Sequence, residues 1–314
     1  MRKTAWITRP PVTERPDAQT WHRSTGLGVA GLGVVIISVA AVTTWTTAPS
    51  VGGSGDTART LAGTFAASTF GLGVTKIGIA IILIGIVLAL WRRVNAVGVA
   101  LPKLRTGPTT GDTRRLTGDL DTPYGPARAS ARAPNPLTIH RMAEVLWLPV
   151  LAMGAMALAA GLILGLVTSS EAAGTEAFRV ASAWSQGTLF LGEGLLLSGI
   201  SFLLGTILAS LRRGGAEVQE SLGVAVQTLK MPATAKAFIA LLAVGMLAAV
   251  VQFVLYGVAA SVAADPAAYA VWVSWLGPFR EVALGVLLAG IVLALASIAK
   301  ALGFQFHRLH QLAV

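Results

Sequence analysis

The chain has 314 residues, of which 54% are hydrophobic and 12% are charged. Soluble proteins carry about 25% charged residues, so this composition excludes an ordinary soluble globule and predicts an integral membrane protein. The absence of Cys excludes thiolate metal sites, Cys nucleophiles and disulfide scaffolds.

Six apolar stretches are long enough to cross a membrane as helices, for which about 20 residues are needed. They predict an all-α integral membrane protein with six transmembrane helices arranged in three hairpins. The spans lie near Thr25–Thr46, Phe70–Trp91, Val145–Thr168, Thr188–Leu211, Ala237–Ala260 and Val282–Leu302.

Basic residues predict the orientation of these spans, because Lys and Arg concentrate on the cytoplasmic side of a membrane. Of the 24 Lys and Arg residues, all but Arg59, Lys76, Arg179 and Arg280 lie on the side of the N-terminus. Both termini are therefore expected in the cytoplasm, and the protein is expected to be a multi-pass protein of the cell (inner or plasma) membrane. The net charge of +10 then favours anionic inner-leaflet lipids as partners and argues against nucleic acid.

Cytoplasmic segments separate the three hairpins. In chain order we expect a basic N-terminal tail (1–24), the first hairpin (25–93), a basic Pro-rich linker (94–140), the second hairpin (141–213), an amphipathic segment (214–236), the third hairpin (237–302) and a C-terminal tail (303–314). The linker is expected to be disordered, because Pro blocks helices and little apolar surface is available to bury. Apolar residues in 216–231, and Leu302, Phe306 and Leu309 at the C-terminus, fall near a helical period, which predicts interfacial helices or continuations of the preceding spans.

Small residues predict where the helices pack, since lipid tails give apolar helices no hydrophobic reason to associate. The candidates are Gly26, Gly28, Gly31 and Gly33 in the first span, Ala157, Gly161 and Gly165 in the third, Gly194, Ser198, Ser201, Gly205 and Ala209 in the fourth, and Gly285, Ala289, Gly290 and Ala294 in the sixth. These positions predict close helix contacts and indicate nothing about a ligand.

Ionisable residues within the spans are candidate functional residues, because placing a charge at mid-membrane costs about 2.5–3.5 kcal/mol or more. Lys76, Glu193 and Glu281 lie near the outer ends of the three returning helices. They predict an outward-facing polar cluster that binds an ion or guards a vestibule. The alternative is a structural salt bridge that joins the hairpins.

Other polar residues offer little chemistry. Gln252 lies deepest in the membrane, with Tyr256 one turn further along the fifth span, and a Gln there more often bonds to another helix than to a substrate. His307 and His310 share a helical face and are the candidates for a metal, but no carboxylate accompanies them there. The chain has no P-loop, H-E-x-x-H or G-x-S-x-G motif, so we expect no catalytic residue, no cofactor and no metal site.

Three functions fit these features. The first is a non-catalytic accessory or scaffolding subunit of a larger membrane complex, which binds other membrane subunits or a second copy of itself. The second is a transporter or channel for a small solute or an ion, using the cluster of Lys76, Glu193 and Glu281. The third is a subunit of a membrane enzyme acting on lipid or quinone, for which no acid–base or nucleophile set is visible. We expect the first.

Overall fold

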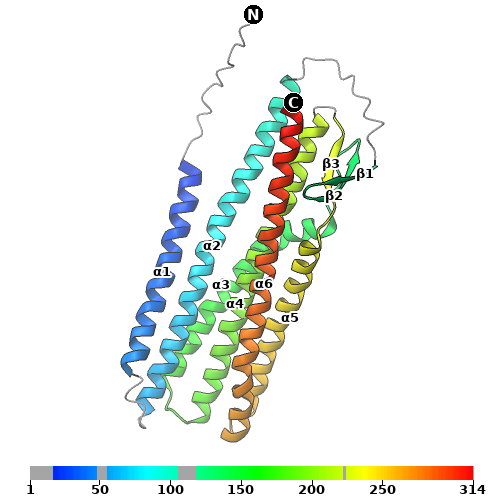
Figure 1. Cartoon of the computed structure of the whole chain (residues 1–314). Helices are drawn as coiled ribbons and strands as arrows, with labels where there is room; N and C mark the ends of the chain where they lie inside the picture. Colours follow the sequence, from blue (N-terminus) through cyan, green and yellow to red (C-terminus); the bar gives the residue numbers. More distant parts are fainter. Residues whose placement is uncertain (1–16, 48–54, 105–117, 222–223, 314) are drawn as a thin grey trace, which may run out of the picture.

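The computed structural model describes residues 17–47, 55–104, 118–221 and 224–313. Within these ranges the chain forms six helices and three short strands (Figure 1). The helices are α1 (Asp17–Thr47), α2 (Gly55–Leu104), α3 (Thr138–Ser170), α4 (Glu176–Ser221), α5 (Ala233–Ser261) and α6 (Pro266–Ala313), and the strands are β1 (Gly118–Thr122), β2 (Gly125–Ser130) and β3 (Val226–Leu229).

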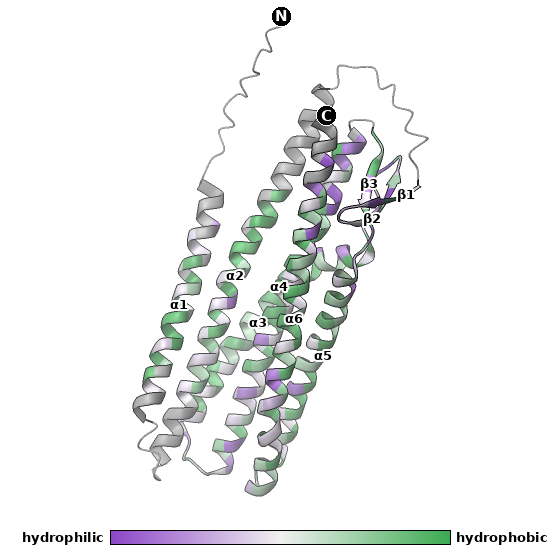
Figure 2. Ribbon diagram, in the orientation of Figure 1, coloured by the Kyte–Doolittle hydropathy of each residue, from purple (hydrophilic) through white to green (hydrophobic). Residues whose placement is uncertain are grey.

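Five of the helices are long and apolar enough to cross a membrane. The candidate spans are Gly63–Leu88 in α2, Thr138–Ser170 in α3, Glu176–Glu220 in α4, Ala233–Ser261 in α5 and Pro266–Gln305 in α6. Apolar residues run along much of each of these helices (Figure 2). α1 contributes a shorter apolar stretch, Ser24–Ala40. The helical membrane-protein class agrees with the prediction, and the count within the described residues is five rather than six.

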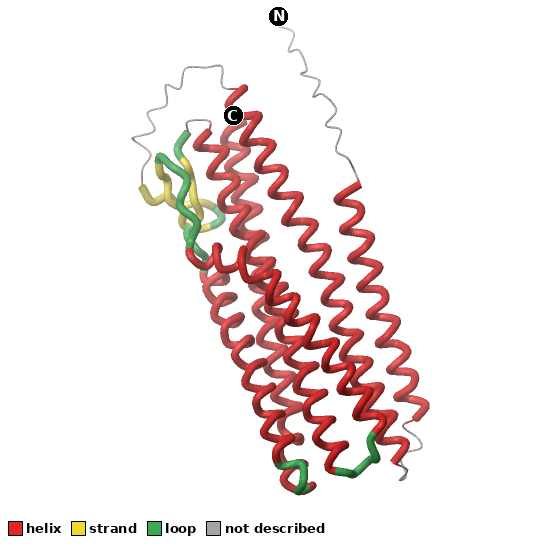
Figure 3. The backbone as a smooth tube through the Cα atoms, turned by 180° about the vertical axis from the view of Figure 1, so that it is seen from behind, coloured by secondary structure: helices red, strands yellow, loops and turns green. Residues whose placement is uncertain are grey.

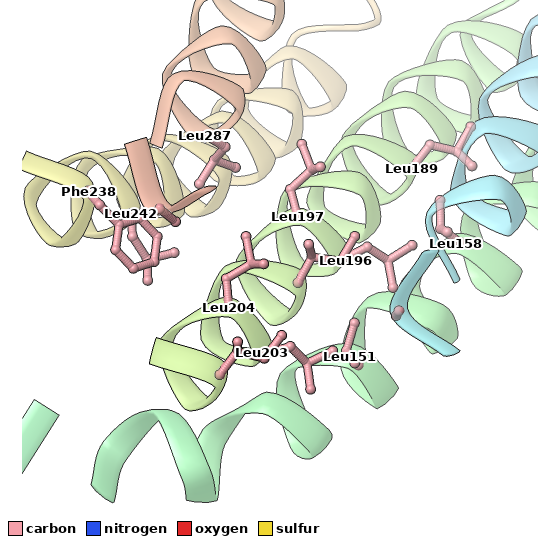
Figure 4. Packing of buried hydrophobic residues seen from close by; sticks show 14 of the residues in the cluster. Leu151, Leu158, Leu189, Leu196, Leu197, Leu203, Leu204, Phe238, Leu242 and Leu287 are labelled. Atoms are coloured by element: carbon pink, nitrogen blue, oxygen red, sulfur yellow. The ribbon is translucent and has the colours of Figure 1, made fainter. Parts of the chain in front are cut away.

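α4 is the central helix of the bundle. In its most apolar window 83% of the residues are buried, against 28–33% in the other four candidate spans. α2, α3, α5 and α6 surround it, and buried Leu side chains join it to its neighbours (Figure 4). An enclosed helix needs no lipid-facing apolar surface, so α4 tolerates Glu193, Ser198 and Ser201 in its middle.

Short turns close the second and third hairpins at the end of the bundle opposite the strands (Figure 3). Asp265 starts α6, because its Oδ1 accepts hydrogen bonds of 2.9 and 3.2 Å from the backbone N–H groups two and three residues on. Pro266 fills the first helical position, where its missing N–H costs nothing. Thr175 caps α4 through a 3.2 Å bond that its Oγ1 accepts from the N–H of Phe178. The sequence therefore specifies both helix starts locally.

A three-stranded antiparallel sheet lies at the other end of the bundle, which we call the sheet end. β1 and β2 form a hairpin inside the segment predicted to be a disordered linker, and β3 pairs with β2 from the segment between α4 and α5. The prediction of disorder is therefore wrong for 118–130, and also for 94–104, which continues α2. Residues 105–117 lie outside the described residues. The fold is mainly helical but it is not all-α.

The sheet escaped prediction because neither of its segments indicates it alone. β2 buries two small residues, Ala127 and Ala129, which have little strand preference. β3 is only four residues long, with Val226 and Thr228 buried. The segment predicted as an interfacial helix instead divides: α4 continues to Ser221, as in the alternative considered, and the strand follows.

Arg308 holds the sheet against the helices. Its side chain is buried near the end of α6, and its Nη1 donates to the carbonyl oxygen of Gln227 at 2.7 Å and to Oε1 of Gln219 at 3.3 Å. The guanidinium also lies over the ring of Phe304, 4.7 Å from its centroid. Burial lowers the pKa of Arg308 to about 10, so the side chain remains charged at neutral pH. The C-terminal segment therefore continues α6, as predicted by the alternative of a helix extension, and joins α6 to the sheet.

An exposed ion pair links β1 to the residue after β3 and predicts a pH dependence. The Nζ of Lys230 donates a 2.6 Å hydrogen bond to Asp119, and this bond and the positive charge of Lys230 lower the pKa of Asp119 below its ordinary value. Because the pKa of Asp119 is lower in the folded chain than in the unfolded chain, the pair stabilises the sheet at pH values above the unfolded pKa, and this contribution disappears as the pH falls through the folded pKa.

We expect an NMR titration of the Asp119 carboxyl carbon to give a higher midpoint in Lys230→Met than in the unmodified chain. Lys236→Met removes an equal charge from an exposed position on α5 and serves as the control. A similar rise in the titration midpoint of Asp119 in both variants would contradict the pairing.

α1 packs against α2 through matched glycines. A Cβ on Gly78 would lie 2.6 Å from the carbonyl oxygen of Gly26, and one on Gly71 would lie 2.9 Å from that of Gly33. Real side chains do not reach such distances, so the two backbones approach as closely as they do only because these positions are Gly. The pairs are seven residues apart on each helix, which places both on one face.

Some of the other predicted packing residues lie against a neighbouring helix, and others are exposed. A Cβ on Gly28, Gly31 or Gly285 would meet no atom within 4 Å, and Ala289 is exposed, so these residues do not pack against another helix among the described residues. The predicted residues that do lie against neighbouring helices include Gly26, Gly33, Gly161, Gly165, Gly194 and Gly205, and Ser198 is fully buried. Spacing alone identifies small residues but does not say which row of a helix faces its neighbour: on α6 the predicted row of Gly290 and Ala294 is buried, whereas Gly285 and Ala289 are exposed.

Candidate functional site

Three charged side chains from the three hairpins meet inside the bundle. Lys76 comes from α2, Glu193 from α4 and Arg280 from α6. The Nζ of Lys76 donates to Oε1 of Glu193 at 2.8 Å, and Nη2 of Arg280 donates to Oε2 at 2.8 Å. We call these three residues the ion-pair cluster. Each oxygen of the carboxylate has its own cation.

The cluster is enclosed by protein. The side chain of Glu193 is 1% exposed, that of Lys76 is 16% exposed and that of Arg280 is 12% exposed. An isolated carboxylate at this depth would be strongly unfavourable, and two charge-assisted hydrogen bonds compensate for the loss of water. Removing either side of the arrangement would leave a buried charge without its partner.

Aromatic rings fix the position of Arg280. Its guanidinium carbon lies 3.8 Å from the centroid of the Phe190 ring and 5.7 Å from that of Phe65. The two rings meet edge to face, with centroids 6.1 Å apart. Phe190 precedes Glu193 by three residues, so α4 presents ring and carboxylate on the same face. A cation over an aromatic face gains about 0.5–2 kcal/mol, more where water is excluded.

The structure brings Lys76 and Glu193 together but places Glu281 elsewhere. Glu281 is exposed on α6, and its neighbour Arg280 occupies the position predicted for it. Successive residues on an α-helix point about 100° apart, so only one of the two faces α4. The signal missed in the sequence was charge balance: a carboxylate has two oxygens to satisfy, and Arg280 was a second cation at the same level.

The ion-pair cluster has two cations and one carboxylate, and therefore an excess of positive charge. Both oxygens of Glu193 accept hydrogen bonds from the protein, so the carboxylate is already occupied as a ligand for a metal or a cation. Within the described part of the chain, Nε of Arg280 is buried and has no hydrogen-bond partner. The arrangement suits the joining of three helices better than cation binding.

Gln252 and Tyr256 connect α5 to the helices around the cluster. The Nε2 of Gln252 donates to the carbonyl oxygen of Leu276 on α6 at 3.2 Å. The hydroxyl of Tyr256 donates to Oε1 of Gln186 on α4 at 3.3 Å, and its ring packs against Phe190 with centroids 5.5 Å apart. Both residues are 1% exposed. The polar groups of both residues therefore form hydrogen bonds between helices.

His307 and His310 lie on α6, but their side chains are outside the described part of the structure. Their identification as weak metal candidates stays a prediction. In the ranges that the structure does describe, no group of three or more His, Asp or Glu is placed to hold a metal ion.

Comparison with known proteins gives no further guidance. No protein-family model matches the chain, and no curated protein or solved structure matches it either.

Proposed function

We propose that the chain is a non-catalytic scaffolding subunit of a larger membrane complex. It would cross the cell membrane six times, with α1 as the sixth crossing and both termini in the cytoplasm. The observation that carries the proposal is the closure of the ion-pair cluster, in which both oxygens of the buried carboxylate bond to cations from other hairpins. This cluster fastens the three hairpins together.

The polar groups of the bundle interior support the same role. A transporter presents polar groups near mid-membrane to a path that its substrate can enter. Here Glu193, Gln252 and Tyr256 each bond to a neighbouring helix. Polar groups that hydrogen-bond to neighbouring helices stiffen the bundle, and this arrangement favours a structural function.

The outer faces offer apolar surface to partner helices or lipid. Exposed residues of this kind include Val35 on α1, Met156 on α3, Leu247 on α5 and Val292 on α6. α1 lies at the edge of the bundle against α2 (Figure 1), which leaves its far side open. Other membrane subunits or a second copy of the chain would bind through such faces, and anionic lipids would fill the rest.

One observation favours transport as a second candidate function. Charged residues buried within membrane spans often mark a substrate pathway, and Nε of Arg280 lies buried without a partner among the described residues. Because the cluster has excess positive charge, the substrate in this case would be an anion rather than a cation. Proteoliposomes containing the purified chain should then take up an anion such as chloride.

Site-specific cross-linking separates the two functions. Because the chain has no Cys, Val35→Cys, Met156→Cys, Leu247→Cys and Val292→Cys each introduce a unique thiol on a different helix. We expect a cross-linker in native membranes to give one discrete protein adduct from one or two of these faces, and chloride flux equal to that of empty liposomes. Lack of a protein adduct at all four positions, together with chloride flux by the isolated chain, would refute the scaffold and support transport.

A further inference from the structure

A cavity of about 420 Å³ opens at the sheet end between α2, α3 and α4. Its polar wall includes His140 from the first turn of α3 and Arg212 from α4, and its apolar wall includes Val87, Leu88 and Trp147. Pro134 and Pro136 of the segment before α3 border it as well. The cavity is remote from the ion-pair cluster, which lies towards the opposite ends of α2, α4 and α6.

Two nitrogen-bearing side chains border this cavity, and one of them carries an unpartnered donor. His140 is only 9% exposed. Nε of Arg212 is buried and has no hydrogen-bond partner in the described part of the chain. Buried donors in folded proteins are almost always satisfied, so Arg212 requires an acceptor that the described residues do not supply.

Of the two described Arg side chains that line the cavity, Arg212 is the one without a carboxylate partner. Arg213, the next residue, is engaged with Glu217 through a 2.8 Å bond from Nε to Oε1. Ser210 and Thr206 also line the cavity, and their hydroxyls donate to helix carbonyls at 2.9 and 3.0 Å. The unmet requirement is therefore for an anionic oxygen group that can accept from the guanidinium of Arg212.

We propose that this cavity binds the phosphate group of a membrane phospholipid. A phosphate offers several acceptor oxygens and matches the planar fork of Arg. The glycerol and upper acyl carbons of a lipid require apolar contacts, which are available at Val87, Leu88 and Trp147. The cavity is accessible from the surface, because two of its lining residues, Leu88 and Glu144, are exposed. Under the proposed topology, the sheet end is the cytoplasmic end, where anionic phospholipids concentrate.

The site is independent of the scaffold function, since a transporter or an enzyme subunit could hold the same lipid. Glu144 adds a carboxylate near the exposed mouth. A headgroup that combines phosphate with an amine therefore also fits, and the recognised chemistry common to all such lipids is the phosphate ester.

Lipid titration of the purified full-length protein tests the proposal. The delipidated protein in detergent is mixed with phosphatidylglycerol, with diacylglycerol or with inorganic phosphate, and bound molecules are measured by native mass spectrometry. We expect phosphatidylglycerol to bind and Arg212→Gln to weaken it about tenfold or more, the loss expected for a hydrogen bond to a charged group. The matched control is Arg141→Gln, which removes the same charge from an exposed position on α3 that does not line the cavity.

Each outcome of this titration decides the proposal. Binding of phosphatidylglycerol without binding of diacylglycerol supports recognition of the phosphate, and competition by millimolar inorganic phosphate would identify free phosphate as the source of the same chemistry. Equal loss in Arg212→Gln and Arg141→Gln, no loss in either, or equal binding of diacylglycerol would overturn it. If Arg212→Gln does not fold, Arg212→Lys and His140→Gln take its place, and unchanged binding by both would also overturn it.

Discussion

Replacement of Glu193 by Leu should lower the free energy of unfolding by about 3–5 kcal/mol, the cost of leaving buried charges without a partner. Lys76 and Arg280 would lose their shared carboxylate while the surrounding helices still enclose them. Unfolding in mixed micelles with increasing dodecyl sulfate, followed by circular dichroism, measures this change. Glu281→Gln is the control, because it removes a carboxylate from an exposed site on α6, directly after Arg280 in the sequence, and it should change stability by less than about 0.5 kcal/mol.

A triple variant distinguishes a structural cluster from a functional one. Replacing a complete buried ion cluster by apolar residues is often neutral or stabilising, so Lys76→Met, Glu193→Leu and Arg280→Met together should recover most of the stability lost in Glu193→Leu. A scaffold would keep its partners in the triple variant, whereas a transporter would lose its flux. If Glu193→Leu destabilised the protein no more than Glu281→Gln, the ion-pair cluster would not fasten the hairpins.

Replacement of Gly33 by Leu should separate α1 from α2. The new side chain would have to occupy space held by the backbone of Gly71 and by Thr75, and overpacking of this kind costs about 1–3 kcal/mol or more. The contact between Ala30 and Thr75 reports the separation, since Oγ1 of Thr75 lies 3.5 Å from the carbonyl oxygen of Ala30. Thiol cross-linking of Ala30→Cys with Thr75→Cys should succeed in the parent chain and fail after Gly33→Leu.

Gly31→Leu provides the control on the same helix. A Cβ on Gly31 meets no atom within 4 Å, so the larger side chain should leave the cross-link intact. Equal loss of the cross-link in both variants would show that bulk anywhere on α1 disturbs it, and the glycine pairing would then not set the helix contact.

The membrane helices could be predicted because each signal is local. About 20 consecutive apolar residues identify a span within its own sequence, and Lys76 and Glu193 stand out because charges are rare there. The choice between Arg280 and Glu281 could not be made the same way. It depends on the rotation of α6 about its axis, which is set by packing against α4 and not by the composition of α6.

The α1 and α2 contact shows a signal that was present but unused. Gly26 and Gly33 on α1 are seven residues apart, as are Gly71 and Gly78 on α2. The equal spacing on the two helices favours this row over Gly28 and Gly31. The cavity at Arg212 and the sheet, by contrast, are formed by segments distant in sequence, and no single segment indicates them.

The pairing of β2 with β3 has a consequence for biogenesis. Residues 131–225 must be synthesised, and α3 and α4 inserted, before β3 emerges to pair with the hairpin of β1 and β2. At ribosomal rates of about 5–20 residues per second this delay is roughly 5–20 s. During that interval the edge of β2 that will bond to β3 has no strand beside it. Under the proposed topology, completion of the sheet would mark the point at which the first two hairpins have both been inserted into the membrane.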